Sequence, residues 1–225
     1  MAQSVLPAES AGNVAPRHAP SRVRLIVKIV IAATFVMFVA ECLRIFVGSN
    51  FHSVVPGKCY RSAQPTAVFL ENVQRTHGVC TIINLRDENE DEPWYQEEKQ
   101  ALKRLKMNLV NAGLSSKEQP PDHDFHRFMR AMKDSPEPIL IHCANGNDRT
   151  GLASAVYLML RTDTPMAEAR GQLSLRYGHI AWSKASCLHR ILDGYESWLT
   201  QTGKAHSADN FYYWGMNVYE QEAPR

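Results

Sequence analysis

The sequence has 225 residues, of which 44% are hydrophobic and 21% are charged, and its formal net charge is +2. Such a composition is typical of a globular domain with an additional segment, and it excludes an intrinsically disordered chain. The small net charge, without any long run of Lys or Arg, argues against nucleic-acid binding, because that needs a basic surface that follows the phosphate backbone.

The cysteines are odd in number and scattered along the chain. They are Cys42, Cys59, Cys80, Cys143 and Cys187. Without a CxxC pair the spacing supports neither a zinc site nor a thioredoxin-like motif, and a domain of this size does not need a disulfide framework. At least one thiol is therefore expected to be free.

Two different segments precede the folded part of the chain. Residues 1–21 are rich in Ala, Pro and Ser, which predicts a disordered N-terminus. Residues 22–48 read RVRLIVKIVIAATFVMFVAECLRIFVG. As a helix, the span from Arg24 to Arg44 is about 30 Å long, which matches the hydrocarbon core of a bilayer. We expect this segment to be a transmembrane anchor or an uncleaved signal anchor, with Lys28 and Arg44 extending toward the interfaces.

A cleaved signal peptide and a buried core helix are the other interpretations of residues 22–48. No A-x-A cleavage pattern follows the apolar run, and the run is apolar on all sides, so both are disfavoured. Positively charged residues come early in the chain, at Arg17, Arg22, Arg24 and Lys28. By the positive-inside rule the N-terminus is cytoplasmic and the following domain faces outward, which in a bacterial cell is the periplasm.

From residue 51 to residue 200, short β-favouring runs alternate with segments of helical periodicity. The predicted strands are Lys58–Arg61, Thr81–Leu85, Asn108–Val110 and Ile139–His142. The predicted helices are Thr66–Arg75, Pro93–Lys106, Asp122–Lys133, Arg149–Arg161, a segment between the expected caps Thr164 and Gly178, and Ser186–Thr200. This alternation predicts an α/β domain with a mostly parallel central sheet of four to five strands flanked by helices. The tail, residues 201–225, contains NFYYWGMNVYE and is expected to dock on the domain as a short helix.

The segment Leu140–Gly151 reads LIHCANGNDRTG and connects the last predicted strand to a helix. Sheets of this kind bind ligands beyond the carboxyl ends of their strands, which is where this loop lies. Unpaired main-chain amides and the positive end of the helix dipole meet there and favour an anion. Gly146 allows a tight turn and a close approach of the backbone to a ligand.

A thiol at the edge of such a loop is favoured in its thiolate form at neutral pH. We therefore expect Cys143 to be a nucleophile directed at phosphorus, with covalent catalysis through a cysteinyl-phosphate that water then hydrolyses. The planar guanidinium of Arg149 can hold two phosphoryl oxygens and stabilise the charge of the transition state. The hydroxyl of Thr150 can hydrogen-bond the sulfur when it becomes the leaving group.

The run HCANGNDRTG resembles the HCxxGxxRTG signature of the cysteine-dependent protein tyrosine and dual-specificity phosphatases. CYRSAQPT, TIINLR and LSSKEQP look like elements of the small bacterial and fungal dual-specificity-like members, so the resemblance covers roughly residues 54–195. It implies that Cys143 is the nucleophile, that Arg149 clamps the phosphate, and that no metal or organic cofactor is needed. It also implies a phosphate cradle formed by Ala144, Asn145, Gly146, Asn147 and Asp148. The persulfide loop of a rhodanese is the alternative, but it is usually one residue shorter between Cys and Arg.

The site also needs a general acid, which protonates the leaving oxygen. No WPD tripeptide occurs, and the acid loop of the relatives corresponds by position to GLSSKEQPPDHD. The expected acid positions there are occupied by Ser115, Ser116 and Lys117, and the nearby carboxylates are Glu118, Asp122 and Asp124. Asp148 lies inside the loop directly before Arg149, as in GxDRT phosphatases. Our prediction is that Asp148 is the proton donor, with orientation of Arg149 as its alternative role.

The substrate and one rival function stay open at this point. The loop carries Ala144, Asn145 and Asn147 where inositol-phosphate and lipid phosphatases often place basic residues. An unspecialised protein tyrosine or dual-specificity activity, on a phosphorylated protein or a small phosphomonoester, is therefore the first expectation. Activity on a phosphoinositide or inositol phosphate is the second. The rival is a non-catalytic module that holds phosphorylated partners, but such a module would be expected to lose Cys143 or Arg149.

Overall fold

The computed structural model describes residues 22–46, 48–180 and 187–220. The N-terminus expected to be disordered, residues 1–21, lies outside the described residues, as do the last five residues of the tail and Ser186 at the start of the last predicted helix. The chain divides into two compact units, Met1–Glu41 and Cys42–Arg225.

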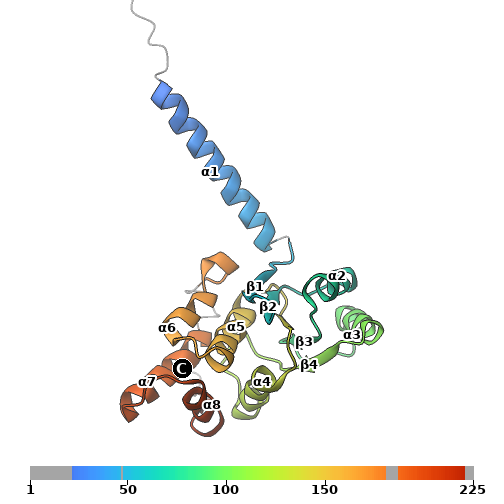
Figure 1. Cartoon of the computed structure of the whole chain (residues 1–225), viewed down its shortest axis with the longest axis vertical. Coiled ribbons are helices and arrows are strands. Elements are labelled where there is room, and N and C mark those ends of the chain that lie inside the picture. Colours follow the sequence, from blue (N-terminus) through green and yellow to red (C-terminus); the bar gives the residue numbers. More distant parts are fainter. Residues whose placement is uncertain (1–21, 47, 181–186, 221–225) are drawn as a thin grey trace, which may run out of the picture. The chain divides into compact units, whose positions relative to one another are not determined.

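Residues 22–41 of the helix α1 (Arg22–Phe46) are the described part of the first unit (Figure 1). Over Arg22–Glu41 it is long and apolar enough to cross a membrane. None of this window is buried, which does not fit the core helix of a globular domain. A signal sequence near the N-terminus has the same length and composition, so α1 by itself fits either a membrane anchor or a signal sequence.

A five-stranded sheet forms the centre of the second unit. Its strands are β1 (His52–Val55), β2 (Cys59–Ser62), β3 (Thr81–Asn84), β4 (Asn108–Asn111) and β5 (Ile139–His142). They lie in the order β1-β2-β5-β3-β4, and all neighbouring pairs are parallel except the antiparallel pair β1 and β2 at one edge. This confirms the mostly parallel α/β sheet expected from the sequence.

The edge strand β1 is not among the predicted strands. Its four residues show neither an apolar run nor strict alternation, so their pattern does not indicate a strand. The turn that follows creates it instead: Gly57 has a φ of 75°, and the amide of Lys58 donates to the carbonyl of Val55 at 3.0 Å. The chain then runs back alongside as β2.

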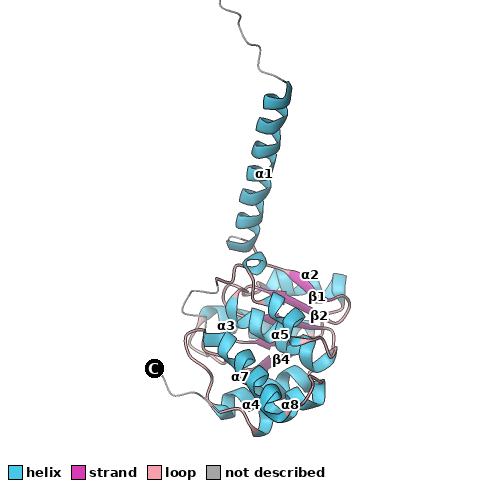
Figure 2. Cartoon of the chain, turned by 90° about the vertical axis from the view of Figure 1, so that its left-hand side faces the viewer, coloured by secondary structure: helices cyan, strands magenta, loops and turns pink. Residues whose placement is uncertain are grey.

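Helices cover both faces of the sheet (Figures 1 and 2). One face carries α2 (Ala67–His77) and α3 (Pro93–Leu105), whose core includes Ile82 and Leu140. The other face carries α4 (Asp122–Asp134), α5 (Asp148–Arg161), α7 (Cys187–Thr202) and α8 (Ala208–Asn217). Because successive side chains of a strand point to opposite faces, Ile83 and Ile141 enter this second, larger core.

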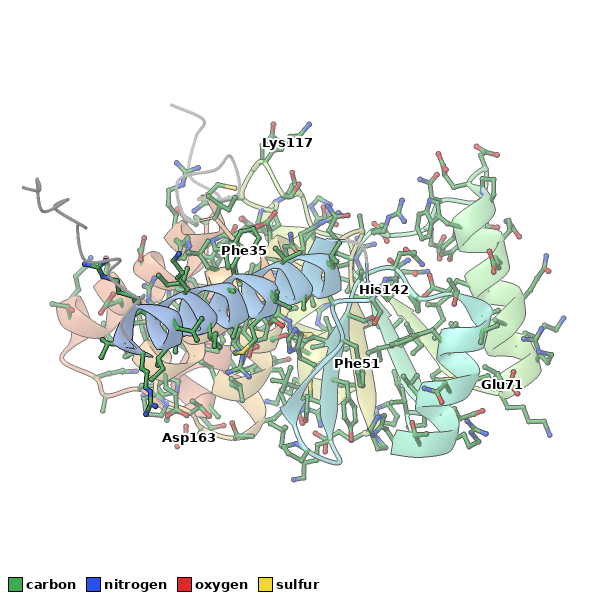
Figure 3. The ribbon with its side chains drawn as sticks, turned by 90° about the horizontal axis from the view of Figure 1, so that it is seen from above. Phe35, Phe51, Glu71, Lys117, His142 and Asp163 are labelled. Carbon is green, nitrogen blue, oxygen red and sulfur yellow. The ribbon has the colours of Figure 1, made fainter. Side chains whose placement is uncertain are left out.

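The helix boundaries follow local signals in the sequence. The hydroxyl of Thr66 accepts a hydrogen bond from the amide of Phe69 and caps α2, which ends where Gly78 takes a left-handed conformation. Pro93 occupies the first turn of α3, where its missing amide hydrogen has no cost. Charged side chains such as Glu71 project outward from these helices (Figure 3).

The helix predicted between Thr164 and Gly178 is wrong for most of its length. Only one turn is α-helical, α6 (Met166–Ala169), and its N-cap is Pro165. Two 3-10 turns follow, η1 (Arg170–Gln172) and η2 (Leu175–Tyr177), and Gly178 ends the second of them in a left-handed conformation.

A tertiary contact explains why this helix is interrupted. Both the main-chain carbonyl and the side-chain oxygen of Gln172 accept hydrogen bonds of 2.9 Å from Arg61 on β2. In a continuous helix that carbonyl would instead accept from the amide of Arg176. Ser174, between the two 3-10 turns, is extended, with a φ of −140° and a ψ of 164°. Tertiary hydrogen bonding therefore overrides helix propensity here.

The aromatic tail forms α8 against α4 and α5. Phe211 and Trp214 are buried, and the Trp214 ring meets that of Phe125 on α4 edge to face. Farther on, the Tyr219 hydroxyl donates a 2.7 Å hydrogen bond to the carbonyl of Pro120, two residues before α4. The tail thus fixes the end of the loop that connects β4 to α4.

Candidate active site

The proposed site begins at the carboxyl end of the central strand. β5 is paired in parallel with β2 on one side and β3 on the other, and the chain leaves it at Cys143. Cys143 is 3% exposed, so its thiol lies in the body of the domain rather than on the surface. Five residues later α5 begins at Asp148, which places the N-terminus of that helix over the thiol's loop.

Glycine is required in the middle of this loop for two reasons. Gly146 has a φ of 72°, a region that residues with a Cβ rarely adopt. A Cβ at this position would lie 2.7 Å from the main-chain carbon of Ser62 and from the nitrogen of Ala63. The loop is therefore packed directly on the end of β2, which fixes its height above the sheet.

Four successive main-chain carbonyls of the loop accept hydrogen bonds from other parts of the domain. The four acceptors belong to Ala144, Asn145, Gly146 and Asn147. The donors are the amide of Gln64, the side-chain amide of Asn50 and the guanidinium of Arg61, at 2.8 to 3.2 Å. Because the N–H and C=O of a planar trans peptide point in opposite directions, anchoring these carbonyls outward turns the amides of the following residues inward. The loop thus has the form of an anion-binding nest.

Arg61 is the main support of this loop from behind. It is completely buried, and its guanidinium lies 3.9 Å above the ring of Tyr177. Burial lowers the pKa of Arg61 to about 10, which still leaves it charged at neutral pH. Its four hydrogen bonds go to Gly146, Asn147 and Gln172, so one cation links the loop to the segment that follows α6.

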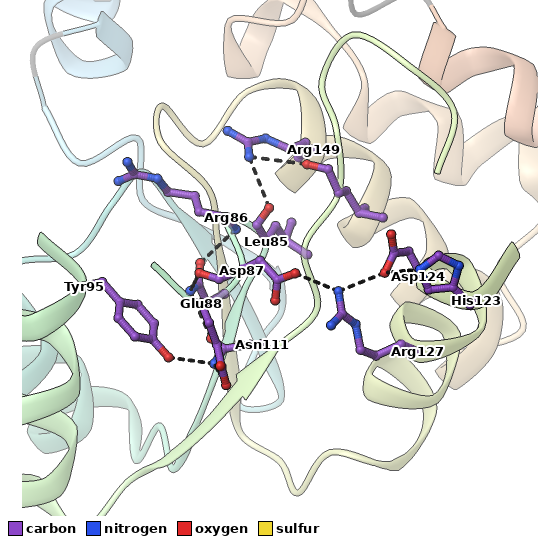
Figure 4. A network of polar contacts seen from close by, with 12 residues as sticks. Leu85, Arg86, Asp87, Glu88, Tyr95, Asn111, His123, Asp124, Arg127 and Arg149 are labelled. Carbon is purple, nitrogen blue, oxygen red and sulfur yellow. Dashed lines mark hydrogen bonds and ion pairs between the residues drawn. The ribbon is translucent and has the colours of Figure 1, made fainter. Parts of the chain in front are cut away.

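Arg149 lies where several strands end. Its guanidinium donates hydrogen bonds to the carbonyls of Leu85, at 3.1 Å, and of Leu114, at 3.4 Å (Figure 4). Leu85 follows β3 and Leu114 follows β4. Arg149 is half-buried.

Arg86 is a second cation at this edge, and it is not among the residues that the sequence predicts for the site. Its guanidinium lies 3.4 Å above the ring of Trp94 and donates to Gln64 at 2.8 Å. Burial and the charge of Arg149 lower the pKa of Arg86, while Cys143 acts in the opposite direction. Arg86 is thus within electrostatic reach of both predicted catalytic residues. Its position directly after β3 was the available signal, because ligands gather at such strand ends.

His142 is held by a buried carboxylate. Its Nε2 lies 2.8 Å from Oε1 of Glu98 on α3, and both side chains are fully buried. The other oxygen of Glu98 accepts from Gln64, which in turn accepts from Arg86. A continuous polar chain therefore runs from the residue before Cys143 to the cation at the rim of the site.

Asp148 contacts a histidine pair that sequence reasoning did not connect with the site. Oδ1 of Asp148 lies 2.7 Å from Nδ1 of His179, and Nε2 of His179 lies 2.8 Å from Nε2 of His189. In the sequence, His179 only follows Gly178, the expected end of a helix. No local pattern could have placed His179 beside Asp148, because the two come from separate elements.

The other candidate carboxylates have different surroundings. Asp124 is paired with Arg127 at 3.1 Å, and Arg127 is also paired with Asp87 (Figure 4). Glu118 and Asp122 are exposed. The hydroxyl of Ser115 accepts hydrogen bonds from the amides of Lys117 and Glu118, which closes a local turn whose Lys117 projects outward (Figure 3). Nowhere in residues 22–46, 48–180 and 187–220 do three or more His, Cys, Asp or Glu side chains gather to hold a metal ion.

This geometry defines a class of protein. A mostly parallel sheet whose central strand leads through a Cys-x5-Arg loop into a helix N-terminus is the arrangement of the cysteine-dependent tyrosine and dual-specificity phosphatases. The family model described as "DSP-PTPase phosphatase fused to NAD+ Kinase" matches residues 53–186, and the chain belongs to this family. It is accordingly a phosphatase of the cysteine-dependent tyrosine and dual-specificity type.

Solved structures show the same fold. The core catalytic domain of the PP-IP phosphatase Siw14 from S. cerevisiae is 21% identical, with a TM-score of 0.50 over 68% of this chain and 93% of that chain. Tk-PTP in its active form is 16% identical, with a TM-score of 0.52 over 66% of this chain and 97% of that chain. At these identities the likeness concerns the fold.

Proposed function

We propose that this phosphatase hydrolyses phosphate monoesters through a cysteinyl-phosphate intermediate, with phosphotyrosine or other phosphorylated residues of proteins as its substrates. The observation that carries the proposal is the loop after β5, where four outward-anchored carbonyls turn a ring of amides inward beside Cys143. Such a ring suits a phosphoryl group with three equatorial oxygens, and it stabilises the negative charge that develops there.

The chain's residues take the following roles in this proposal. Cys143 attacks phosphorus, and the loop amides from Ala144 to Asp148 bind the phosphoryl oxygens. Arg149 exchanges its carbonyl partners for two of those oxygens, which its planar fork fits. The buried hydroxyl of Thr150 makes no hydrogen bond within the described residues and is available to the sulfur as it leaves.

Asp148 is our proton donor. It is the first residue of α5, its side chain is 32% exposed, and it is the one acidic residue inside the loop that also carries Arg149. The rival Asp124 is held in an ion pair with Arg127, and Glu118 lies on an outward-facing turn. In the first step Asp148 gives a proton to the leaving oxygen, and in the second it accepts one from the attacking water.

An inositol phosphate is the second candidate substrate, and Arg86 is the observation that favours it. This cation acts on Cys143 and Arg149 electrostatically and is fixed by Trp94 and Gln64. A substrate with further phosphates beside the reacting one would gain from it. The name of Siw14, a PP-IP phosphatase, points in the same direction. Phosphorylated proteins remain the first candidate substrates, because Asn145 and Asn147 in the loop are neutral.

We further propose that α1 anchors the protein in a membrane, with the N-terminus in the cytoplasm and a catalytic domain over residues 51–200 that faces outward. Support comes from the exposed apolar helix and from the cationic residues before it. A reporter fused after Arg225 tests the orientation, because its activity depends on the side of the membrane that it reaches. Reporter activity on the cytoplasmic side would contradict the proposal.

Hydrolysis of p-nitrophenyl phosphate by the detergent-solubilised chain tests the chemistry. Its leaving group needs little protonation, so the assay reports on the nucleophile and not on the acid. We expect C143S to abolish turnover and C80S, a partly exposed thiol away from the loop, to leave it unchanged. Vanadate binding without any hydrolysis would instead support the non-catalytic module.

A substrate panel then separates the two substrate classes. We expect phosphate release from phosphotyrosine peptides to exceed release from inositol polyphosphates. R86A should then lower activity on the peptides only slightly. A preference for inositol polyphosphates that R86A removes would make the second candidate the function.

A further inference from the structure

Three titratable side chains form an unbroken line that starts at the loop. The distance from Asp148 Oδ1 to His179 Nδ1 is 2.7 Å, and that from His179 Nε2 to His189 Nε2 is 2.8 Å. The two imidazole rings are tilted by 54° with their centroids 4.9 Å apart. Both nitrogens of His179 are therefore engaged, one by a carboxylate and one by a second imidazole.

The fold holds this line in place from three separate elements. Asp148 begins α5, His179 follows η2, and His189 lies on α7. His179 is 1% exposed, while His189 is half-buried and reaches the surface. The segment of His179 is tied to the catalytic loop by a 3.2 Å hydrogen bond from the side-chain amide of Asn147 to the carbonyl of Gly178. The contact is built by tertiary structure and is not a chance meeting of surface groups.

The hydrogen-bond chemistry of this line allows one proton to move without disturbing the rest. When His179 is doubly protonated, both its nitrogens donate: Nδ1–H to Asp148 and Nε2–H to His189. When the Nδ1 proton passes to the carboxylate, Asp148 becomes the donor to Nδ1, while the bond from Nε2–H to His189 stays as it was. Both states satisfy every partner, and both need a neutral His189 as acceptor.

Burial and the neighbouring charges keep His189 in that form. Burial lowers the pKa of His189, and the neighbouring His179 and Arg170 lower it further, against a smaller opposite effect of Asp193. Its imidazole is thus neutral at neutral pH. Burial raises the pKa of the nearby Cys187 thiol, and Asp148 adds a smaller effect in the same direction, whereas Arg190 acts in the opposite direction. Cys187 therefore stays a neutral thiol and adds no charge.

We propose that Asp148 and His179 share the catalytic proton as one unit, with His189 as the fixed acceptor that completes it. This inference rests on the proposed role of Asp148 as proton donor. A carboxyl on its own is ionised at neutral pH, whereas a carboxylate and an imidazole in contact bind their shared proton jointly. His179 and His189 are positioning residues, because they act through Asp148 and do not touch the substrate.

The Nδ1 proton of His179 passes to the carboxylate of Asp148. As the bond from sulfur to phosphorus forms and the bond from phosphorus to the leaving oxygen breaks, the carboxyl of Asp148 gives this proton to that oxygen. His179 is then neutral. When water attacks phosphorus and the bond to sulfur breaks, the proton of that water passes to Asp148 and on to Nδ1, which restores the starting state and the thiolate.

The test compares two substrates across pH in the full-length protein. Phenyl phosphate needs a protonated leaving group, and p-nitrophenyl phosphate scarcely does. H179N keeps a side-chain amide that can donate to Asp148 but holds no titrating proton. In H179N we expect the alkaline limb of the pH profile, where kcat/KM on phenyl phosphate declines as the pH rises, to move at least one pH unit lower. At pH 7 the ratio of the phenyl to the p-nitrophenyl rate should fall about tenfold, because each unit beyond the limb costs a factor of ten.

His189 supplies a second pair of variants should H179N fail to fold. H189L removes the acceptor and should move the limb in the same direction, whereas H189Q offers a carbonyl oxygen and should restore the wild-type limb. H123Q is the matched control, because the side chain of His123 is 80% exposed and belongs to α4. The alkaline limb of the H123Q profile should not move.

D148N separates this inference from the proposed function. If D148N loses activity on phenyl phosphate selectively while H179N and H189L keep the wild-type limb and ratio, the shared proton is wrong and the acid assignment stands. If D148N has no selective effect, both are wrong, although C143S still reports on the nucleophile. The inference stands when D148N, H179N and H189L all lose phenyl phosphate hydrolysis selectively and H189Q does not.

Discussion

The guanidinium of Arg61 donates a 2.8 Å hydrogen bond to the carbonyl of Gly146 from behind the loop that carries Cys143. Arg61 belongs to β2, which pairs in parallel with β5, so the support and the loop rise from neighbouring strands. The same guanidinium binds the carbonyl of Gln172, 111 residues away. The shape of the anion nest therefore depends on a buried cation outside the signature sequence.

Replacing this cation by lysine should damage both stability and activity. Lysine in R61K keeps the charge, but its single ammonium cannot serve the carbonyls of Gly146 and Gln172 in the geometry of a planar fork. Each buried carbonyl left without a donor costs about 1–3 kcal/mol. We expect the free energy of unfolding to fall by about 3 kcal/mol in urea titrations. We also expect kcat/KM on p-nitrophenyl phosphate to fall about 100-fold, because the nest loses its alignment.

The control for R61K is R75K on the exposed surface of α2, which should match the wild type in both measurements. Wild-type activity in R61K, at whatever stability, would show that the loop keeps its shape without the guanidinium.

Gly146 should tolerate no side chain. In G146A the left-handed φ costs about 1 kcal/mol, and contact with the backbone of Ser62 and Ala63 adds about 1–3 kcal/mol or forces the loop to move. We expect a loss of at least about 100-fold in kcat/KM on p-nitrophenyl phosphate, together with weaker vanadate binding.

Two other glycines separate the causes of this effect. Gly78 has a φ of 67° but open space around it, and Gly171 has open space and no left-handed φ. G78A should lose about 1 kcal/mol of stability and keep full activity, and G171A should change neither. If G146A behaved like G78A, the close packing of the loop on β2 would not matter for catalysis.

The part of the site that the sequence could predict is local in the chain. A buried strand, a glycine-containing turn and a helix start follow each other within the run LIHCANGNDRTG, so their physical meaning can be derived from adjacent residues. The mostly parallel sheet follows from the alternation of strands and helices, and the structure confirms it. The starts of α2 and α3 were predictable because Thr66 and Pro93 are local signals.

What escaped prediction depends on contacts between distant residues. A buried arginine in a strand looks from the sequence like a surface residue, and only the carbonyls of Gly146 and Gln172 make its burial favourable. The same cause interrupts the helix expected before Gly178. His179 lies next to Asp148 only because α5 and the segment after η2 pack together. Such partners cannot be identified from periodicity.

Alkaline pH should destabilise the domain through buried tyrosines. The hydroxyl of Tyr195 is fully buried beside His206, and burial raises the pKa of Tyr195 to about 12. The unfolded chain loses this proton near pH 10, so the contribution to stability is complete below pH 10 and is lost as the pH rises to about 12. We expect the free energy of unfolding to fall across this window, with at most about 3 kcal/mol due to Tyr195.

Urea titrations from pH 8 to pH 12 measure this slope. Y195F should flatten it, and Y213F, whose ring is 52% exposed, should leave it unchanged. Tyr157, whose pKa is also raised by burial and by its hydrogen bond to Glu137, should account for part of the slope that persists in Y195F. A slope unaffected by Y195F would contradict the role assigned to this hydroxyl.

Glu98 should matter for folding and for the loop at once, although it lies on the helix α3. Its carboxylate contacts His142, the residue directly before Cys143, at 2.8 Å, and it also binds Gln64, whose amide donates to the carbonyl of Ala144. E98A leaves the fully buried His142 and the half-buried Gln64 without this partner, and the loss of one partner costs about 3–5 kcal/mol in fully buried pairs. Glu97, at the preceding position of the same helix, is exposed, so E97A is a control for E98A. We expect E98A to unfold at a much lower urea concentration and, where still folded, to lose kcat/KM on p-nitrophenyl phosphate, because both its partners hold the loop.

E98Q should recover much of the stability, since its side chain still offers an oxygen and an amide to the same two groups. Equal stability and activity in E98A and E97A would mean that the buried contact does not support the loop.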